Sequence, residues 1–327
     1  MVGQLARISR RLRGAGLLLV VAVFLAAFAS PAAARPYTAL GDSYTAGPLI
    51  PNQTGDPPGC LRSDRNYPHL VANALKLSLT DVSCSGATTK DMFASQGLEG
   101  EDNPPQLDAV EPDTSVVTLG IGGNDIGFSR IIEDCTAVTP NGPVQAGGGP
   151  PYRYDSCKDY YFPEGGEDTL AKRIDATQEK VKDVLVAPSL EARETRPGIH
   201  DRAPGASVYV RDYPAVLPPK DLSLQSTRQQ CWPQMPVTYE DIPYLRATQE
   251  RLNAMLARAV NAANATAGKS FARFVATYPG SVNHHACSDP LTRYIEPLTP
   301  TSPAAPVHPN ARGEAYMADV VRKTIRK

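Results

Sequence analysis

Short apolar runs alternate with longer amphipathic stretches along this chain of 327 residues, and this alternation limits the possible folds more than any other feature. Five runs are typical of strands, at 37–40, 77–84, 115–122, 206–214 and 271–279. Apolar residues recur at helical spacing in four further stretches, at 67–76, 168–187, 239–268 and 308–326. Such alternation predicts an α/β domain with a parallel sheet that is covered by helices on both faces.

The first 34 residues have the layout of a secretory signal peptide. Four arginines without an acid precede 13 apolar residues at 17–29, and small residues then lead to an expected cleavage after Ala34. The apolar run is shorter than the roughly 20 residues that span a bilayer. We therefore expect a secreted protein in which 1–34 is removed and 35–327 forms one domain. The export route, general or twin-arginine, stays open.

The charge of the mature chain excludes some partners. Without the four leader arginines, 29 basic residues (33 − 4) face 34 acidic ones, a net charge of −5. A mild acidic balance gives no basic surface for nucleic acid or an anionic membrane. No second apolar stretch of about 18 residues follows the leader. We expect a soluble monomer with no stable membrane anchor and no nucleic-acid partner.

Six cysteines in an exported chain indicate disulfides, although six allow 15 connectivities. They are Cys60, Cys84, Cys135, Cys157, Cys231 and Cys287. No two are spaced as close metal ligands are. The adjacent histidines of "HHAC" at 284–287 point to opposite faces of an extended chain. We therefore expect neither a metal nor another cofactor.

Polar residues and glycines follow several of the predicted strands. Ser43 follows the first strand in "GDSYTAG", Gly86 the second in "CSGATT" and Asn124 the third in "GGND", while His308 precedes the last helix in "HPN". Alone, Ser43 is more simply a helix cap, and Asp42 beside it is expected to orient the turn. In a parallel sheet, however, the carboxyl ends of the strands meet at one edge. The pattern therefore places a hydroxyl, an amide and an imidazole together.

These groups suit acyl transfer. A serine hydroxyl needs a base to become a good nucleophile, and histidine is the usual base near neutral pH. The developing oxyanion needs hydrogen-bond donors, for which the backbone N–H of Ser43, the backbone N–H of Gly86 and the amide of Asn124 are candidates.

The four motifs, in this order and over nearly the whole mature chain, resemble those of the SGNH hydrolases, also called GDSL lipases and esterases. The resemblance implies a three-layer α/β/α, flavodoxin-like fold with a mostly parallel five-stranded sheet. It implies Ser43 as nucleophile, His308 as base, and an oxyanion hole of Ser43, Gly86 and Asn124. It further implies metal-independent hydrolysis of carboxylic esters, with an ester or lipid as the substrate.

The cysteine layout is similar to that of the family's secreted bacterial lipases. By this resemblance and by order along the chain, the expected pairs are Cys60–Cys84, Cys135–Cys157 and Cys231–Cys287. The Gly- and Pro-rich segment 136–167 has no periodicity, and we expect it to lie over the acyl site as a stapled loop.

One position departs from the family pattern. The family usually has an aspartate three residues before the histidine, and this chain has Ala305 there. We expect a dyad in which the Ala305 carbonyl orients His308. Glu296 and Asp289 are the nearest upstream acids that could complete a triad instead.

Rival functions remain at this stage. The same machinery could serve a phospholipase or a carbohydrate acetylesterase. A secreted binding module would keep the fold without the chemistry, but such a module predicts a damaged motif, and all four are intact.

Overall fold

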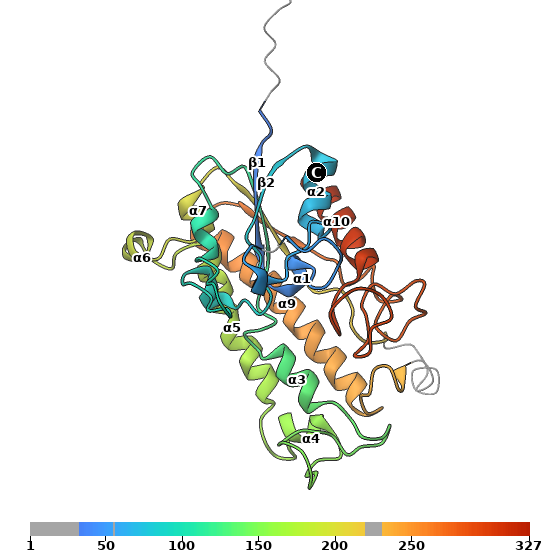
Figure 1. Cartoon of the computed structure of the whole chain (residues 1–327). Helices are drawn as coiled ribbons and strands as arrows, with labels where there is room; N and C mark the ends of the chain where they lie inside the picture. The colour runs from blue at the N-terminus through green and yellow to red at the C-terminus, as the bar shows by residue number, and fades with distance from the viewer. Residues whose placement is uncertain (1–32, 55, 220–230) are drawn as a thin grey trace, which may run out of the picture. The chain divides into compact units, whose positions relative to one another are not determined.

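The computed structural model describes residues 33–54, 56–219 and 231–327, and Arg35–Lys327 form a compact unit. Its centre is a five-stranded sheet in the order β2-β1-β3-β4-β5, with every neighbouring pair parallel (Figure 1). The strands are β1 Pro36–Gly41, β2 Ser78–Asp81, β3 Val116–Gly120, β4 Ser207–Arg211 and β5 Ala272–Val275. This confirms the predicted parallel sheet, and each strand lies within or next to its predicted run. The predicted leader, apart from its last two residues, lies outside the described residues.

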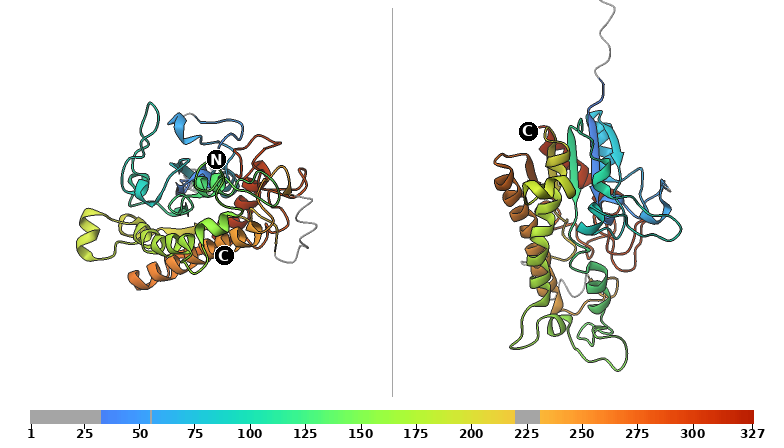
Figure 2. Two further views of the ribbon diagram at one scale, coloured as in Figure 1. Left: turned by 90° about the horizontal axis from the view of Figure 1, so that it is seen from below. Right: turned by 90° about the vertical axis from the view of Figure 1, so that its left-hand side faces the viewer.

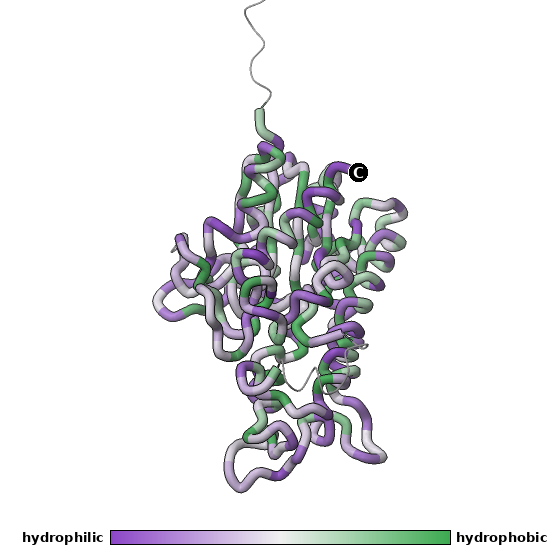
Figure 3. Tube along the Cα trace, turned by 90° about the vertical axis from the view of Figure 1, so that its right-hand side faces the viewer, coloured by the Kyte–Doolittle hydropathy of each residue, from purple (hydrophilic) through white to green (hydrophobic). Residues whose placement is uncertain are grey.

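Helices cover both faces of the sheet and make three layers. On one face, α2 (Tyr67–Leu75) and α10 (Ala311–Ile325) pack against the strand side chains that point to that face, such as Tyr37 and Val116. On the other face lie α5 (Thr169–Leu185) and α9 (Asp241–Ala267), side by side in both views of Figure 2. Each of these two helices buries one side against the sheet. Green and purple segments alternate along the helical coils visible in Figure 3. No helix in the described ranges has the length and apolar character needed to cross a membrane.

Shorter helices occupy the connections. They are α1 Ser43–Ala46, α3 Phe128–Asp134, α4 Cys157–Tyr161, α6 Leu190–Thr195 and α7 Ile199–Arg202, with 3-10 turns η1 Pro58–Cys60, η2 Thr89–Met92 and η3 Gln106–Ala109. The segment 136–167, expected to be irregular, contains α4. Ser156 caps that helix by accepting the N–H of Asp159 at 3.1 Å. A serine three residues before an acid was the available signal for this helix.

Three disulfides link Cys60 to Cys84, Cys135 to Cys157 and Cys231 to Cys287, which are the pairs that the resemblance implies. They join residues 24, 22 and 56 positions apart. Loops of this size let each bridge contribute roughly 2–4 kcal/mol to stability.

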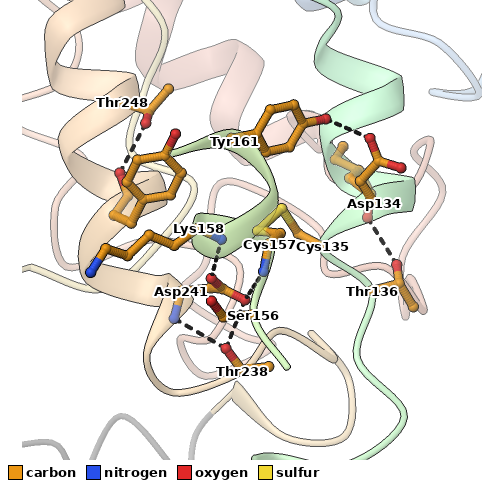
Figure 4. Close-up of a disulfide and its surroundings, with 12 residues drawn as sticks. Asp134, Cys135, Thr136, Ser156, Cys157, Lys158, Tyr161, Thr238, Asp241 and Thr248 are labelled. Atoms are coloured by element: carbon orange, nitrogen blue, oxygen red, sulfur yellow. Dashed lines mark hydrogen bonds between the residues drawn. A yellow bond between two sulfur atoms is a disulfide. The ribbon is translucent and has the colours of Figure 1, made fainter. Parts of the chain in front are cut away.

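The second bridge joins the end of α3 to the start of α4, as Figure 4 shows. The buried carboxylate of Asp241, at the start of α9, accepts the N–H groups of Cys157 (3.0 Å) and Lys158 (2.9 Å). The Tyr161 hydroxyl donates to Asp134 at 2.6 Å. The disulfide and these hydrogen bonds therefore fasten α3, α4 and α9 to one another.

The order of the sheet reverses between β1 and β3, since β2 flanks β1 on one side and β3, β4 and β5 follow on the other. In open α/β sheets ligands bind at such a reversal, beyond the carboxyl ends of the strands. Gly41 and Gly120 end these two strands opposite each other. The buried side chain of Gln106 fixes the end of β1, because it accepts the N–H of Gly41 (2.8 Å) and donates to its carbonyl (2.9 Å).

Gly41 should tolerate no side chain. It has φ +155°, and a Cβ there would lie 2.7 Å from the Gly120 carbonyl oxygen, a backbone atom that cannot rotate away. We expect Gly41→Ala to lower the free energy of unfolding in urea by about 2–3 kcal/mol, the usual cost of overpacking. Gly205→Ala is the matched control, since its Cβ would meet no atom within 4 Å. Equal stability of the two variants would contradict this reading of the strand end.

Candidate active site

Ser43 lies just beyond the carboxyl end of β1, as the first residue of α1. Asp42 is the N-cap of this helix and accepts the N–H of Tyr44 at 3.0 Å. The Asp42 N–H donates to the Gly120 carbonyl at 3.0 Å, which ties the turn to β3. Asp42 therefore orients the turn, as expected, and Ser43 presents its hydroxyl at the switch point of the sheet.

His308 reaches Ser43 from the far end of the chain. Its Nε2 lies 2.8 Å from the Ser43 Oγ, and its Nδ1 lies 2.7 Å from the carbonyl oxygen of Pro306. A carbonyl only accepts, so Nδ1 carries the proton and Nε2 is free to accept one from the serine hydroxyl. The structure thus brings together the hydroxyl and the imidazole that the sequence singles out.

The prediction that Ala305 orients His308 is wrong. The Ala305 carbonyl instead accepts the backbone N–H of His308 at 3.2 Å, so the loop's own turn uses it. Between them Val307 has φ +59°, an unusual conformation for a β-branched residue. This turn carries the ring toward Pro306, one residue later than expected.

Several contacts stabilise the strained turn at Val307. Its carbonyl accepts the hydroxyl of Tyr44 at 2.6 Å, and its side chain is 1% exposed. Tyr44 also packs against the imidazole, with ring centroids 5.1 Å apart. The loop of the base is therefore fastened to the helix of Ser43.

Neither upstream acid meets the imidazole. The buried carboxylate of Glu296 accepts from Asn310 (2.7 Å) and Ser302 (2.6 Å), and the Glu296 N–H donates to the His308 carbonyl at 2.9 Å. Asp289 accepts the N–H of Leu291 at 2.7 Å on an exposed turn. Glu296 thus supports the backbone around His308, and the ring's recorded acceptor is a neutral carbonyl.

Burial sets the protonation of His308. Removal from water lowers the pKa of this imidazole below its ordinary 6.5, and the hydrogen bond to Pro306 only partly opposes the shift. Ser43 beside it is 7% exposed. The neutral ring, which can accept a proton, therefore prevails at neutral pH.

Gly86 lies in a turn that is fixed by two hydrogen bonds and a disulfide. The preceding Cys84 donates its N–H to the Gly41 carbonyl (3.0 Å) and is bonded to Cys60, and the Ser85 N–H donates to the Cys60 carbonyl (3.0 Å). Gly86 has φ +80°, which favours glycine. Within the described ranges no hydrogen bond is recorded from the N–H of Gly86 or of Ser43. Both donors are available to a substrate.

Asn124 follows β3 in the turn that faces Gly86. Its amide nitrogen donates to the Ala87 carbonyl at 2.9 Å. Because an amide has two N–H groups, this bond leaves one proton for an oxyanion. Asp125 accepts the N–H (3.0 Å) and the hydroxyl (2.5 Å) of Thr89, which fixes the turn against η2.

Sequence reasoning missed Tyr213, which links the two turns of the site. Its buried hydroxyl donates to Asp42 and accepts the N–H of Gly123 at 2.8 Å. Tyr213 comes two residues after β4 ends, but it lies inside the run 206–214 that was predicted as a strand, so the strand-end rule did not single it out.

An apolar cavity lies between α3 and α9, and its walls include Tyr44 and Val307, which are next to Ser43 and His308 in the chain. Near the site its walls are Tyr44, Gly123 and Tyr213, and further away they include Ile131, Leu252 and 235–237. Among described residues of 136–167, Thr136 is the one that lines it. The acyl-site wall that we expected from that segment is thus formed mostly by other elements.

A second groove is lined by polar and charged residues of the Asn124 turn and of neighbouring elements. Its lining includes Asn124, Asp125, Lys90, Lys180 and Arg196. Two consecutive residues, Gly123 and Asn124, thus line an apolar cavity and a charged groove respectively.

A serine next to a neutral histidine, with free N–H donors around it, at the switch point of a flavodoxin-like sheet, defines a serine hydrolase of the α/β/α class. The chain belongs to the GDSL-like lipase/acylhydrolase family, whose model matches residues 39–316. It is a carboxylic ester hydrolase.

Known proteins of similar sequence or fold agree with this assignment. The chain is 37% identical to Lipase 2 of Streptomyces coelicolor over 90% of this chain and 88% of that protein. It is 28% identical to an esterase of Streptomyces scabiei over 97% of this chain and 95% of the esterase.

Two crystal structures share the fold. The extracellular lipase of Streptomyces rimosus has a TM-score of 0.56 and 22% identity, with 89% of this chain and 99% of that one covered. The phospholipase A1 of Streptomyces albidoflavus has a TM-score of 0.58 at the same identity and coverage.

The lowered pKa of His308 predicts activity that persists into mildly acid conditions. If the neutral ring accepts the proton of Ser43, the acidic limb of kcat/KM should have its midpoint below pH 6.5, the ordinary value for histidine. Ala305→Asp should move the limb upward by about one unit or more, because a nearby carboxylate stabilises the imidazolium. Ala305→Asn is the neutral control and should leave the limb in place. An unmoved limb in the aspartate variant would contradict this account.

Tyr213→Phe tests the link between the two turns. The change removes a hydroxyl and leaves Asp42 and the Gly123 N–H without their buried partner, each at a cost of about 1–3 kcal/mol. We expect urea unfolding to show a loss in that range or above, together with a lower kcat at unchanged KM for a small ester. Tyr209→Phe is the control, since this tyrosine is also buried at 4% exposure but packs on the α2/α10 face. A Tyr213 variant as stable and active as the control would argue against the link.

Proposed function

We propose that Ser43 and His308 form the catalytic dyad of an exported lipase or esterase. The Ser43 Oγ attacks the ester carbonyl carbon while its proton passes to the His308 Nε2. Three donors, the N–H groups of Ser43 and Gly86 and the amide of Asn124, hold the oxyanion. The observation that carries the proposal is the 2.8 Å contact between the imidazole and the hydroxyl, with Nδ1 occupied by Pro306.

The remaining steps regenerate the enzyme. The tetrahedral intermediate collapses, the C–O bond to the alcohol breaks, and His308 gives its proton to the leaving oxygen. Water then attacks the acyl-enzyme, His308 takes a proton from that water, and the acid leaves as the proton returns to Ser43. A neutral acceptor on Nδ1 fixes the tautomer for each step.

The substrate that we propose is an ester with an extended apolar acyl chain. The walls of the apolar cavity are almost entirely hydrophobic and include Tyr44 and Val307, the chain neighbours of Ser43 and His308. Each methylene that leaves water for such a cavity gains about 0.8 kcal/mol. An acetyl group would leave most of it unfilled, which favours a lipase over an acetylesterase.

We propose that residues 1–34 are an export signal and 35–327 the mature catalytic domain. Three disulfides among the described residues support an oxidising destination. The similar lipase of Streptomyces rimosus is extracellular, and Lipase 2 of Streptomyces coelicolor matches over most of the chain.

Nitrophenyl esters from acetyl to palmitoyl test the site and the cavity together. Ser43→Ala should fold and lose hydrolysis of every ester. Ile131→Trp, which fills the cavity between α3 and α9, should lower kcat/KM for long-chain esters by about tenfold or more and spare the acetyl ester. Leu190→Trp on α6, at a position 77% exposed, controls for the added indole. Persistent activity in Ser43→Ala would overturn the nucleophile, and uniform losses in Ile131→Trp would overturn the acyl site.

A further inference from the structure

Arg211, the last residue of β4, buries its guanidinium completely. The guanidinium carbon lies 5.3 Å from the centroid of the Tyr67 ring and 5.6 Å from that of the Tyr213 ring. Its Nη1 donates to the carbonyl of Asp212, while its Nε and Nη2 have no recorded hydrogen bond in the described part of the chain. A buried cation is costly unless an opposite charge offsets it, so this arginine needs an ionised acid nearby.

Two contacts place the guanidinium at the turn that carries Ser43. A Cβ on Gly120 would lie 2.5 Å from the Nη2 of Arg211, so the guanidinium occupies the space beside the end of β3. The carbonyl of the same Gly120 accepts the N–H of Asp42 at 3.0 Å. Tyr213, whose ring faces the guanidinium, donates its hydroxyl to Asp42. Asp42 is therefore an acid within reach of the charge of Arg211.

The other titratable groups around Arg211 are neutral or have donors of their own. Burial raises the pKa of Glu314 on α10 well above its ordinary value, so this carboxyl keeps its proton. Burial likewise raises the pKa of the hydroxyls near the guanidinium, which are those of Tyr37, Tyr67 and Tyr213. Asp212 accepts hydrogen bonds from three donor groups in the segment after β5. Asp42 is thus the acid whose charge offsets Arg211.

The ionised form of Asp42 sets the direction of the hydrogen bonds that join two turns of the site. Its Oδ1 accepts the N–H of Tyr44, and its Oδ2 accepts the hydroxyl of Tyr213. The Tyr213 oxygen in turn accepts the N–H of Gly123 at 2.8 Å. A proton on Oδ2 would put a second hydrogen into the contact with Tyr213, and the phenol would have to turn its own hydrogen away.

Burial and a like charge both favour that unwanted proton. Burial is the main cause that raises the pKa of Asp42, and the carboxylate of Asp125 after β3 adds to the rise. The hydroxyl of Tyr44 stays neutral, because burial raises its pKa as well. Arg211 supplies the opposing positive charge. A guanidinium stays protonated throughout the pH range in which carboxyls titrate, so this support does not itself titrate.

We propose that Arg211 is a positioning residue of the active site, whose buried charge keeps Asp42 ionised and thereby fixes the turns of Ser43 and Asn124. This inference rests on the proposed roles of Ser43 and Asn124. Burial, and not Arg211, lowers the pKa of His308. The charge of Arg211 therefore acts on the reaction through Asp42 and not through the base.

Removal of the charge at similar side-chain length tests the proposal through the pH dependence of kcat/KM for nitrophenyl butyrate. Arg211→Met should move the acidic limb upward by about one unit or more, because Asp42 loses the cation that favours its ionised form. Activity on that limb should then fall by about tenfold, while activity at about pH 9 should stay within about threefold of the parent. Arg211→Lys keeps the charge and should leave the limb in place. A loss that is equal at every pH would assign Arg211 to packing alone and overturn the proposal.

The carboxyl carbon of Asp42 provides a measurement that does not depend on activity. Its carbon-13 resonance, assigned by its absence from Asp42→Asn, should titrate at about 6 in the parent and about one unit or more higher in Arg211→Met. Arg273→Met, which removes an exposed arginine of β5, is the control and should leave the carboxyl and the acidic limb unchanged. An Asp42 midpoint that stays in place in Arg211→Met would refute the inference, as would one that moves without the acidic limb.

If Arg211→Met does not fold, folding itself tests the charge balance. The double variant Arg211→Met, Asp42→Asn removes both charges and leaves neither ion without its partner. It should therefore unfold at a higher urea concentration than Arg211→Met alone. A double variant that resists urea no better than the single one would show that the two charges do not offset each other.

The nucleophile is tested separately from Arg211. If Ser43→Ala still hydrolysed nitrophenyl butyrate, the proposed catalytic role of Ser43 would be wrong, and the positioning role that rests on it would fall as well. If hydrolysis depended on Ser43 but Arg211→Met kept the parent's acidic limb, only the role of Arg211 would fail.

Discussion

The carboxylate of Asp42, buried at 1% exposure where β1 turns into α1, is the group on which the site depends. It accepts the N–H of Tyr44 and the hydroxyl of Tyr213, and Tyr213 in turn accepts the N–H of Gly123. One acid thus joins the turn of Ser43 to the end of β4 and to the Gly123–Asn124 turn after β3. Burial raises its pKa to about 6, and the hydrogen bond from Tyr213 opposes the rise. Arg211, fully buried nearby, also favours the charged form.

His308 is oriented by a neutral carbonyl and not by a carboxylate. A carboxylate beside His308 would stabilise the imidazolium and raise the pKa, whereas the Pro306 carbonyl fixes the tautomer with a dipole alone. Glu296, the acid in this loop, accepts hydrogen bonds from Asn310 and Ser302 and does not contact the imidazole. Orientation of the ring and stabilisation of its charge are therefore separate tasks here, and the loop of His308 performs the first of them without a formal charge.

Periodicity and strand-end residues predicted the sheet, the four long helices and the meeting of Ser43 with His308, because these depend on local patterns and on the geometry of parallel strands. Gly268 ends α9 in the left-handed conformation, which glycine adopts without strain. The predictions for the acceptor of His308 and for the acyl-site wall were less successful, because they depend on a single φ angle and on tertiary contacts. No pattern announces that Val307 is left-handed, so the acceptor of His308 was misplaced by one residue. The cavity walls come from α3 and, far along the chain from it, from 235–237 and α9.

Val307 takes part both in the cavity wall and in the positioning of His308. Its backbone sets the direction of the next residue, His308, its carbonyl holds Tyr44, and its side chain lines the apolar cavity. A substitution that reshapes the cavity at this position also shifts the base, so acyl preference and turnover cannot evolve independently there. On α3, Phe128 lines the cavity and also packs against His308, with ring centroids 5.9 Å apart. The lining residues of α9 have no recorded contact with this imidazole in the described part of the chain. Variation in acyl preference among descendants of this chain should therefore accumulate on α9 while position 307 stays fixed.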